Sequence, residues 1–313
     1  MLSRCLVGVS FLFITAVHAA ERPFQALYVF GDSLSDTGNL AAIRGDFPPP
    51  FYQNRVSNGP LAIDVLAERL GLSAQASLYL LGRDAGGNYA VAGARARGND
   101  LIDLTSQVVA FLAQHRNQAP ADALYVVFIG GNDVRSARGV PDAEAGNAIV
   151  DDAVSEVADN VQRLIRAGAR SLLVMNSPDI GLLPETALLA QASGDRFLAQ
   201  RATRLSERYA VQLHRALQRL RHDDTWLQEV DIYTASRLIA RQAAARFGIT
   251  NITDACFSTQ TFTFHPDCAG GSGFERFYFF DEIHPTAKVH RLIGEAIYRG
   301  AFEEERERAE RAK

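Results

Sequence analysis

The feature that most constrains this chain is a regular alternation of short apolar runs with longer amphipathic stretches. Five apolar runs have the length and composition of buried strands: 27–31, 89–92, 124–130, 171–176 and 226–232. Four stretches between them repeat apolar residues at helical spacing: 61–70, 101–114, 148–167 and 195–221. Strands regularly separated by helices indicate a parallel sheet covered on both faces. We therefore predict an α/β fold in which helices form a layer on each side of a mostly parallel sheet.

The first twenty residues have the composition of a signal peptide. Arg4 supplies a positive charge, residues 5–17 are apolar, and the small residues Ala19 and Ala20 follow. The apolar stretch is too short to span a bilayer. Cys5 lies at its head, whereas a lipid-modified cysteine would lie at its end. We therefore expect an exported protein, periplasmic or secreted, without a lipid anchor.

The remainder of the chain contains no repeat, linker or break in composition. With 47% hydrophobic residues in 313, it can build one sizeable core, so we expect a single domain over residues 21–302. Residues 303–313 mix charges of both signs and are expected to form a solvated tail. The formal net charge of -4 gives no indication of a nucleic-acid partner. No later segment offers 18 uninterrupted apolar residues, so we expect no transmembrane segment.

Two cysteines remain once the leader, with Cys5, is removed. Cys256 and Cys268 would close a short loop, and in an oxidising compartment such a pair forms a disulfide worth about 2 to 4 kcal/mol. A metal site is the alternative, but no second pair of thiols accompanies these two. We predict the disulfide.

One segment between predicted elements is irregular. Residues 47–60 contain Pro48-Pro49-Pro50 and Ser57-Asn58-Gly59-Pro60, which exclude both helix and strand. The segment is either a plain connection or part of the rim of a substrate site. The sequence favours neither.

Candidate catalytic residues follow the predicted strands. Ser33 comes directly after the first strand, Gly93 ends the second and Asn132 follows the third. Asp281 and His284 precede the last helix, with Pro285 suited to its first turn. Ligands of parallel sheets bind beyond the carboxyl ends of the strands, so we expect these residues to meet there.

Together these residues supply the parts that acyl transfer needs. Ser33 offers a nucleophilic hydroxyl, and His284 offers a base whose ordinary pKa near 6.5 suits neutral pH. Asp281, three residues earlier, can fix the imidazole tautomer. The backbone N–H groups of Ser33 and Gly93 and the side-chain amide of Asn132 can donate to the oxyanion.

These motifs resemble those of a known family. Residues 29–39, Val-Phe-Gly-Asp-Ser-Leu-Ser-Asp-Thr-Gly-Asn, resemble the first block of the GDSL (SGNH) lipases and esterases. Gly93, Asn132 and the Asp281/His284 pair are similar to the later blocks. The stretches Ser57–Pro60, Leu104–Val108 and Asn176–Asp179 resemble the secreted bacterial phospholipase/lecithinase/hemolysin branch.

The resemblance runs from about Leu27 to about Tyr298, nearly the whole mature chain. It implies a flavodoxin-like three-layer sandwich and hydrolysis of carboxylic esters with neither cofactor nor metal. The branch implies lipid acyl esters as substrates, and the family also includes acyltransferases.

Two other functions compete with this interpretation. A metal-dependent phosphoesterase would take its ligands from Asp32, Asp36, Asn132, Asp133 and His284, but it leaves Ser33 and Gly93 without a role. An exported binding protein could have kept the fold and lost catalysis, although the serine and histidine both stand in intact motifs.

Two other histidines could replace His284 as the base. His290 lies within the last predicted helix, where we expect its side chain on the surface. His265 lies in the loop between the two cysteines and lacks a carboxylate at the same spacing. We therefore predict that His284 is the base.

Overall fold

The computed structural model describes residues 24–271 and 273–303. The predicted signal peptide and all of the charged tail after its first residue lie outside the described residues. The predicted boundaries of the single domain stay a prediction.

The main sheet is built from the apolar runs and is parallel throughout. Its strands are β1 (Ala26–Gly31), β2 (Ala123–Phe128), β3 (Ser171–Met175) and β4 (Trp226–Val230), in the order β1-β2-β3-β4. All six residues of β2 are buried, since the strand lies inside the sheet with helices over both faces. This explains why the strand is apolar at every position instead of at alternate ones.

The run at 89–92 was predicted as a strand, and the structure corrects this. The segment runs beside β1: the Val29 N–H donates to the Gly87 oxygen at 2.9 Å, and the Tyr89 and Val91 N–H groups donate to the Val29 and Gly31 oxygens at 2.7 and 3.1 Å. On its other side, Asn88 bridges to Ala76. The ladder with β1 is interrupted, because the Gly31 N–H donates to Gln107 Oε1 at 2.8 Å instead of to this segment. Because the segment lies on the side of β1 opposite β2, its place in the sheet is that of the second strand in the flavodoxin-like order 2-1-3-4-5.

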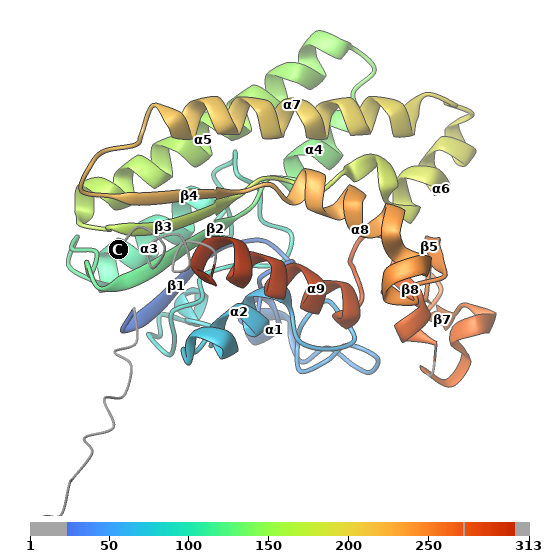
Figure 1. Cartoon of the computed structure of the whole chain (residues 1–313), viewed down its shortest axis with the longest axis horizontal. Helices are drawn as coiled ribbons and strands as arrows, with labels where there is room; N and C mark the ends of the chain where they lie inside the picture. Colours follow the sequence, from blue (N-terminus) through green and yellow to red (C-terminus); the bar gives the residue numbers. More distant parts are fainter. Residues whose placement is uncertain (1–23, 272, 304–313) are drawn as a thin grey trace, which may run out of the picture.

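Helices cover both faces of the sheet. They are α1 (Asn39–Arg44), α2 (Ala62–Leu70), α3 (Leu104–Gln114), α4 (Gly131–Arg138), α5 (Ala143–Ala167), α6 (Pro184–Ser193), α7 (Leu198–Gln218), α8 (Ile232–Phe247) and α9 (Ala287–Tyr298). Helices α5 and α7 pack together on one face, and α2 and α9 pack together on the other (Figure 1). The three-layer α/β/α sandwich is therefore confirmed. No helix within the described ranges is long and apolar enough to cross a membrane.

Four helices match predicted stretches, with ends that shift by a few residues. The shift is largest at α5, which begins five residues before the predicted stretch at 148. There the side chain of Asp142 accepts a hydrogen bond from the Ala145 N–H at 2.7 Å, so this residue caps the helix. Helices α1, α4, α6 and α8 were not predicted.

Short elements complete the fold. They are the 3₁₀ turns Tyr79–Leu81, Ile180–Leu182, Pro266–Gly271 and Phe274–Arg276, the π turn Arg299–Glu303, and strands β5 (Asn251–Ala255), β6 (Phe257–Ser258), β7 (Thr263–Phe264) and β8 (Phe277–Phe279). Strands β5 and β8 pair in parallel, and β6 and β7 form a hairpin. These strands gather at one end of the molecule, beside α8 (Figure 1).

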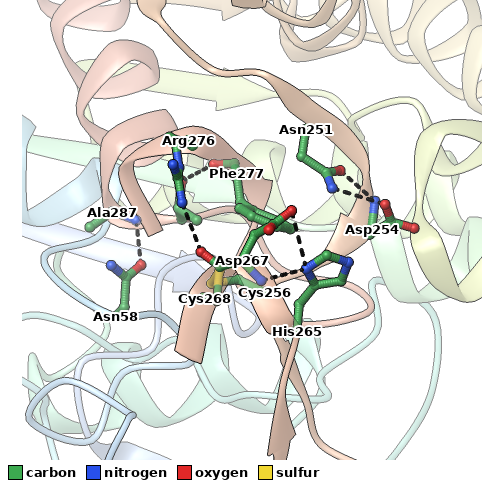
Figure 2. The surroundings of a disulfide bond; sticks show 11 residues. Asn58, Asn251, Asp254, Cys256, His265, Asp267, Cys268, Arg276, Phe277 and Ala287 are labelled. Carbon is green, nitrogen blue, oxygen red and sulfur yellow. Dashed lines mark hydrogen bonds and ion pairs between the residues drawn. A yellow bond between two sulfur atoms is a disulfide. The ribbon is translucent and has the colours of Figure 1, made fainter. Parts of the chain in front are cut away.

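The predicted disulfide is present in this end of the molecule. Cys256 and Cys268 are bonded, with a Cα–Cα distance of 5.6 Å, and both are fully buried (Figure 2). A small aromatic core surrounds them: Phe257, Phe274, Phe277 and Phe280, with Phe51 and Phe264 packed against it. Phe280 directly precedes Asp281, so this core, which we call the disulfide core, adjoins the predicted catalytic loop.

Candidate active site

Ser33 lies in a tight turn that starts where β1 ends. The Ser35 and Asp36 N–H groups both donate to the Asp32 oxygen, at 3.0 and 2.9 Å, which closes the turn. The Leu34 N–H donates to the Asp32 carboxylate at 3.0 Å. The turn therefore fixes Ser33 beyond the carboxyl end of β1, where the sequence placed it.

The glycine before this turn is required by its neighbours. A Cβ on Gly31 would lie 2.5 Å from the Phe128 backbone oxygen on β2. The Gln107 side chain binds both sides of the glycine: its Oε1 accepts from the Gly31 N–H and its Nε2 donates to the Gly31 oxygen, each at 2.8 Å. Gln107 was not predicted to take part in the site, and the available signal was its place in the stretch Leu104–Val108, which resembles the family.

Ser33, His284 and Asp281 form a continuous hydrogen-bonded chain. His284 Nε2 lies 2.8 Å from Ser33 Oγ, and His284 Nδ1 lies 2.8 Å from both Asp281 carboxylate oxygens. Asp281 is 2% exposed and His284 8% exposed. The carboxylate holds the proton on Nδ1, so Nε2 is left as an acceptor for the serine proton.

The loop that carries Asp281 and His284 is held by its own backbone and by the disulfide core. The Asp281 carboxylate accepts from the His284 N–H at 2.7 Å, and the Phe280 N–H donates to the His284 oxygen at 2.8 Å. Glu282, between them, accepts from the Thr259 hydroxyl at 2.8 Å. The loop is therefore anchored to the β6–β7 hairpin.

The irregular segment 47–60 also supports this loop. The Ser57 hydroxyl donates to the Pro285 oxygen at 3.0 Å, and Asn58 Oδ1 accepts from the Ala287 N–H at 2.9 Å (Figure 2). The segment forms no helix or strand, as predicted. It contributes no residue to the lining of the pocket beside Ser33, so it braces the catalytic loop and does not form that rim.

Asn132 presents its amide from the first turn of α4. The residue before the helix, Gly130, has φ +113°, and a Cβ there would lie 2.3 Å from the Tyr209 ring. Asn132 Nδ2 donates to the Ala94 oxygen at 2.8 Å, and Asn132 Oδ1 accepts from Arg135 at 2.7 Å. The amide orientation is thus fixed from two sides.

The two predicted backbone donors are unengaged. Within the described ranges, neither the Ser33 N–H nor the Gly93 N–H donates a hydrogen bond. Gly93 has φ +90° and directly precedes Ala94, whose oxygen contacts Asn132. Ser33, Asn132 and His284 line one pocket, whereas Gly93 lies outside its lining.

Arg135 is a residue of the site that the sequence did not reveal. Its guanidinium contacts Asn132 and also binds Glu185, at 2.9 Å from Nε to the carboxylate. Arg138 binds the same carboxylate at 2.9 Å. The sequence signal for this role was that Arg135 lies three residues after Asn132 on a helix. Its second partner, Glu185, is about 50 residues away in sequence, so this contact could not be read from local spacing.

Three buried carboxylates surround the nucleophile turn. Asp36 accepts from four backbone N–H groups, those of Gly38, Asn39, Leu40 and Ala92, so it ties the Ser33 turn to the Gly93 loop. Burial raises the pKa of Asp36 above its ordinary value. Burial also raises the pKa of Asp32 and that of Asp133 to about 6.

The proposed metal ligands are engaged in other contacts. Asp36 is bound by backbone amides, Asp133 accepts from the Ala96 and Arg97 N–H groups, and His284 is held between Asp281 and Ser33. Among residues 24–271 and 273–303, no three His, Cys, Asp or Glu side chains are grouped as a metal site. These contacts favour the acyl-transfer interpretation.

A narrow apolar pocket opens beside Ser33 and His284. Its cavity volume is about 60 Å³. Apolar side chains from several elements line it: Ile180, Leu182, Leu183, Ile232, Phe279, Ile283 and Ile293. An apolar slot next to a nucleophile suits the hydrocarbon part of an ester.

The two competing histidines lie in different surroundings. His290 was expected on the surface, but it is 1% exposed and its Nδ1 accepts from the Ala62 N–H at 3.2 Å. The expectation was wrong because this face of α9 packs on α2. His265 is half-buried, and its Nδ1 accepts from the Asp267 N–H at 3.2 Å (Figure 2). Neither contacts Ser33.

Comparison with known proteins identifies related sequences. The model of a family described as GDSL-like Lipase/Acylhydrolase matches residues 27–297. "Lipase 1" of Photorhabdus luminescens is 36% identical over 180 residues, which are 57% of this chain and 26% of that protein. "Phosphatidylcholine-sterol acyltransferase" of Aeromonas hydrophila is 26% identical over 93% of this chain and 94% of that protein. "Thermolabile hemolysin" of Vibrio parahaemolyticus is 29% identical over 89% of this chain and 65% of that protein. The chain thus spans about a quarter of the lipase and about two thirds of the hemolysin.

Proposed function

The chain belongs to the GDSL-like lipase/acylhydrolase family of serine ester hydrolases, and on that premise we propose that it cleaves acyl esters through an acyl-enzyme on Ser33. His284 is the base and Asp281 fixes its tautomer. The Ser33 N–H, the Gly93 N–H and the Asn132 amide donate to the oxyanion. The observation that carries the proposal is the unbroken chain from Ser33 Oγ through His284 to Asp281.

The reaction proceeds in two halves. Ser33 Oγ attacks the ester carbonyl carbon while its proton passes to His284 Nε2, and the three donors stabilise the oxyanion. The bond to the alcohol oxygen breaks as His284 returns the proton to that oxygen. Water then attacks the acyl-enzyme and gives its proton to Nε2, and the acid leaves as Ser33 regains a proton.

The substrate class that we propose is a lipid acyl ester. The apolar lining of the pocket beside Ser33 supports an acyl chain as the group bound there. Three relatives are named as a lipase, a phosphatidylcholine-sterol acyltransferase and a hemolysin. The second name also supports transfer to an acceptor alcohol, which would replace water in the second half of the reaction.

We further propose that the protein is exported. The predicted signal peptide at residues 1–20 supports export, and so does the Cys256–Cys268 disulfide, since disulfides persist in oxidising compartments.

The test of this function is a pair of serine variants in the same turn. Ser33→Ala should lower kcat by several orders of magnitude, because the acyl-enzyme cannot form and only the oxyanion donors remain. Ser35→Ala is the matched control, since its buried hydroxyl has no partner among the described residues. The measurements are hydrolysis of short and long acyl esters, with and without an acceptor alcohol, and labelling by a fluorophosphonate probe. Normal turnover by Ser33→Ala would refute the proposal.

A further inference from the structure

His290 lines the pocket beside Ser33, and its buried Nε2 has no hydrogen-bond partner in the described part of the chain. We propose that His290 is a specificity-determining residue, whose Nε2–H donates to an oxygen carried within the acyl chain of the substrate. The acyl groups that fit this pocket best would then carry an ether, keto or hydroxyl oxygen along the chain. This inference rests on the proposed acyl-enzyme function of Ser33.

His290 reaches the pocket from α9. It lines the cavity together with Ile293, which lies about one turn further along the same helix face. The same cavity is lined by Ser33 and His284. An acyl group on Ser33 therefore extends into the space that His290 borders.

The contacts of the ring determine which nitrogen carries the proton. Nδ1 accepts from the Ala62 N–H at 3.2 Å, so it carries no proton. Complete burial lowers the pKa of His290 to about 3, and the ring is therefore neutral. The proton of a neutral ring must then be on Nε2, which makes this atom a donor.

Nε2 is the exception among the polar groups of the pocket. It has no hydrogen-bond partner in the described part of the chain. Neighbouring polar groups are engaged: the Ser236 hydroxyl donates to the Tyr233 oxygen at 3.0 Å, and the Tyr278 hydroxyl donates to the Ser236 oxygen at 3.4 Å. Of the residues that line this pocket, only His290 has a buried side-chain nitrogen or oxygen without a partner among the described residues.

The acyl chain is a better occupant than the alcohol. The alcohol must leave and water must enter before the second half of the reaction, whereas the acyl group stays bound to Ser33. A narrow cavity is therefore better suited to the acyl group, which remains bound. Its volume of about 60 Å³ exceeds the roughly 15 Å³ that one water needs, so water can occupy it before the substrate binds.

The unpartnered donor produces selectivity because burying it without an acceptor is unfavourable. A pure hydrocarbon chain beside Nε2–H offers it no acceptor. A chain with an oxygen at the right position would supply the missing acceptor. We therefore expect kcat/KM to be about tenfold higher for the chain whose oxygen is best placed than for the hydrocarbon chain of equal length.

Matched esters and two substitutions test the proposal in the full chain. Each hydrocarbon ester is paired with an ether of equal length: butanoyl with methoxyacetyl, pentanoyl with 3-methoxypropanoyl, and hexanoyl with 4-methoxybutanoyl. His290→Asn places an oxygen near Nδ1, so it keeps the acceptor for Ala62 but removes the Nε2 donor. His290→Gln places an amide near Nε2, so it keeps a donor but gives up that acceptor.

The ratio of kcat/KM for ether over hydrocarbon ester is the readout, since intrinsic reactivity cancels between wild type and variant. We expect the ratio for at least one pair to fall about tenfold in His290→Asn and to be retained in His290→Gln, with thermal unfolding confirming that both fold. Equal ratios in all three proteins for every pair would overturn the inference and show that no substrate oxygen reaches Nε2–H. Failure of Ser33→Ala to abolish hydrolysis of the same esters would instead overturn the proposed function.

Discussion

Asn132 illustrates how single residues prepare the site before substrate arrives. Its amide is already held by the Ala94 oxygen and by Arg135, so no reorientation is needed when charge develops on the substrate. Arg135 is itself fixed by Glu185, which extends the support to α6. The oxyanion role that we propose for Asn132 therefore depends on a set of contacts rather than on one side chain.

The first residue-scale prediction concerns this amide. Asn132→Ala should lower kcat about 10²- to 10³-fold with little change in KM, because the donor acts on the transition state. Ser136→Ala, an exposed change four residues on in α4, is the control, since its hydroxyl contacts only the Asn132 backbone oxygen. Steady-state kinetics on a soluble ester measures both. A change confined to KM would make Asn132 a substrate-binding residue instead.

The second residue-scale prediction concerns Asp32 and pH. Burial raises its pKa from 3.8 to about 6, so the folded protein holds this proton more tightly than the unfolded chain. The free energy of unfolding therefore falls as pH rises from about 4 through about 6. Asp32→Asn removes this dependence, and its stability relative to wild type should rise by up to about 3 kcal/mol between pH 4 and pH 7.

Urea unfolding at a series of pH values measures this difference. Asp122→Asn, at an exposed position next to β2, controls for the loss of a carboxylate in general. A stability difference between Asp32→Asn and wild type that stays constant from pH 4 to pH 7 would contradict the prediction.

At the scale of residues, the sequence predicts those parts of the site that lie within short motifs. The nucleophile turn and the Asp281-x-x-His284 spacing each lie within a few consecutive residues, and the structure places His284 2.8 Å from both Ser33 and Asp281. The burial of His290 could not be predicted, because it depends on which face of α9 packs on Ala62 of α2. The role of Arg135 depends in the same way on Glu185.

At the scale of elements, the pattern of apolar residues predicts the central strands of the sheet more reliably than the strands at its edges. The central strands were predicted because burial on both faces makes them apolar throughout. The segment at 89–92 has the same composition, yet its ladder with β1 is interrupted where the Gly31 N–H binds Gln107, and only the tertiary structure reveals that difference. Helix α8 (Ile232–Phe247) was not predicted, and the predicted strand at 226–232 overlaps it only at Ile232.

The disulfide core provides the element-scale prediction. The Cys256 and Phe257 N–H groups donate to the Phe279 and Phe280 oxygens at 3.1 and 2.8 Å, directly before Asp281. Replacing both cysteines by serine should lower the free energy of unfolding by about 2 to 4 kcal/mol. It should also lower kcat, because the loop that holds His284 loses its anchor.

Denaturant unfolding and steady-state kinetics of the double variant test both effects. Thr261→Val, at an exposed position in the same loop, serves as the control. Unchanged kcat together with lowered stability would show that the disulfide core is a stabilising element without influence on the catalytic loop.

At the scale of the whole molecule, the site joins the two ends of the domain. Ser33 and His284 are 251 residues apart in sequence. The nucleophile turn follows β1 in the sheet, whereas His284 lies three residues before α9, in the helical layer over one face. Helix α9 packs against α2 with close contact at Gly294. We therefore expect the packing between these helices to influence the distance between His284 Nε2 and Ser33 Oγ.

This contact at Gly294 carries the last prediction. A Cβ at this position would lie 2.7 Å from the Val65 Cβ and 2.8 Å from the Ala62 backbone oxygen. Backbone cannot yield as a side chain can, so Gly294→Ala should move α9 away from α2 and cost about 1 to 3 kcal/mol of stability. The same shift should slow fluorophosphonate labelling of Ser33, because His284 moves with α9. Gly300→Ala, where a Cβ would meet nothing within 4 Å, is the matched control. Labelling at the wild-type rate in a destabilised Gly294→Ala protein would show that the catalytic loop is positioned independently of the α2–α9 packing.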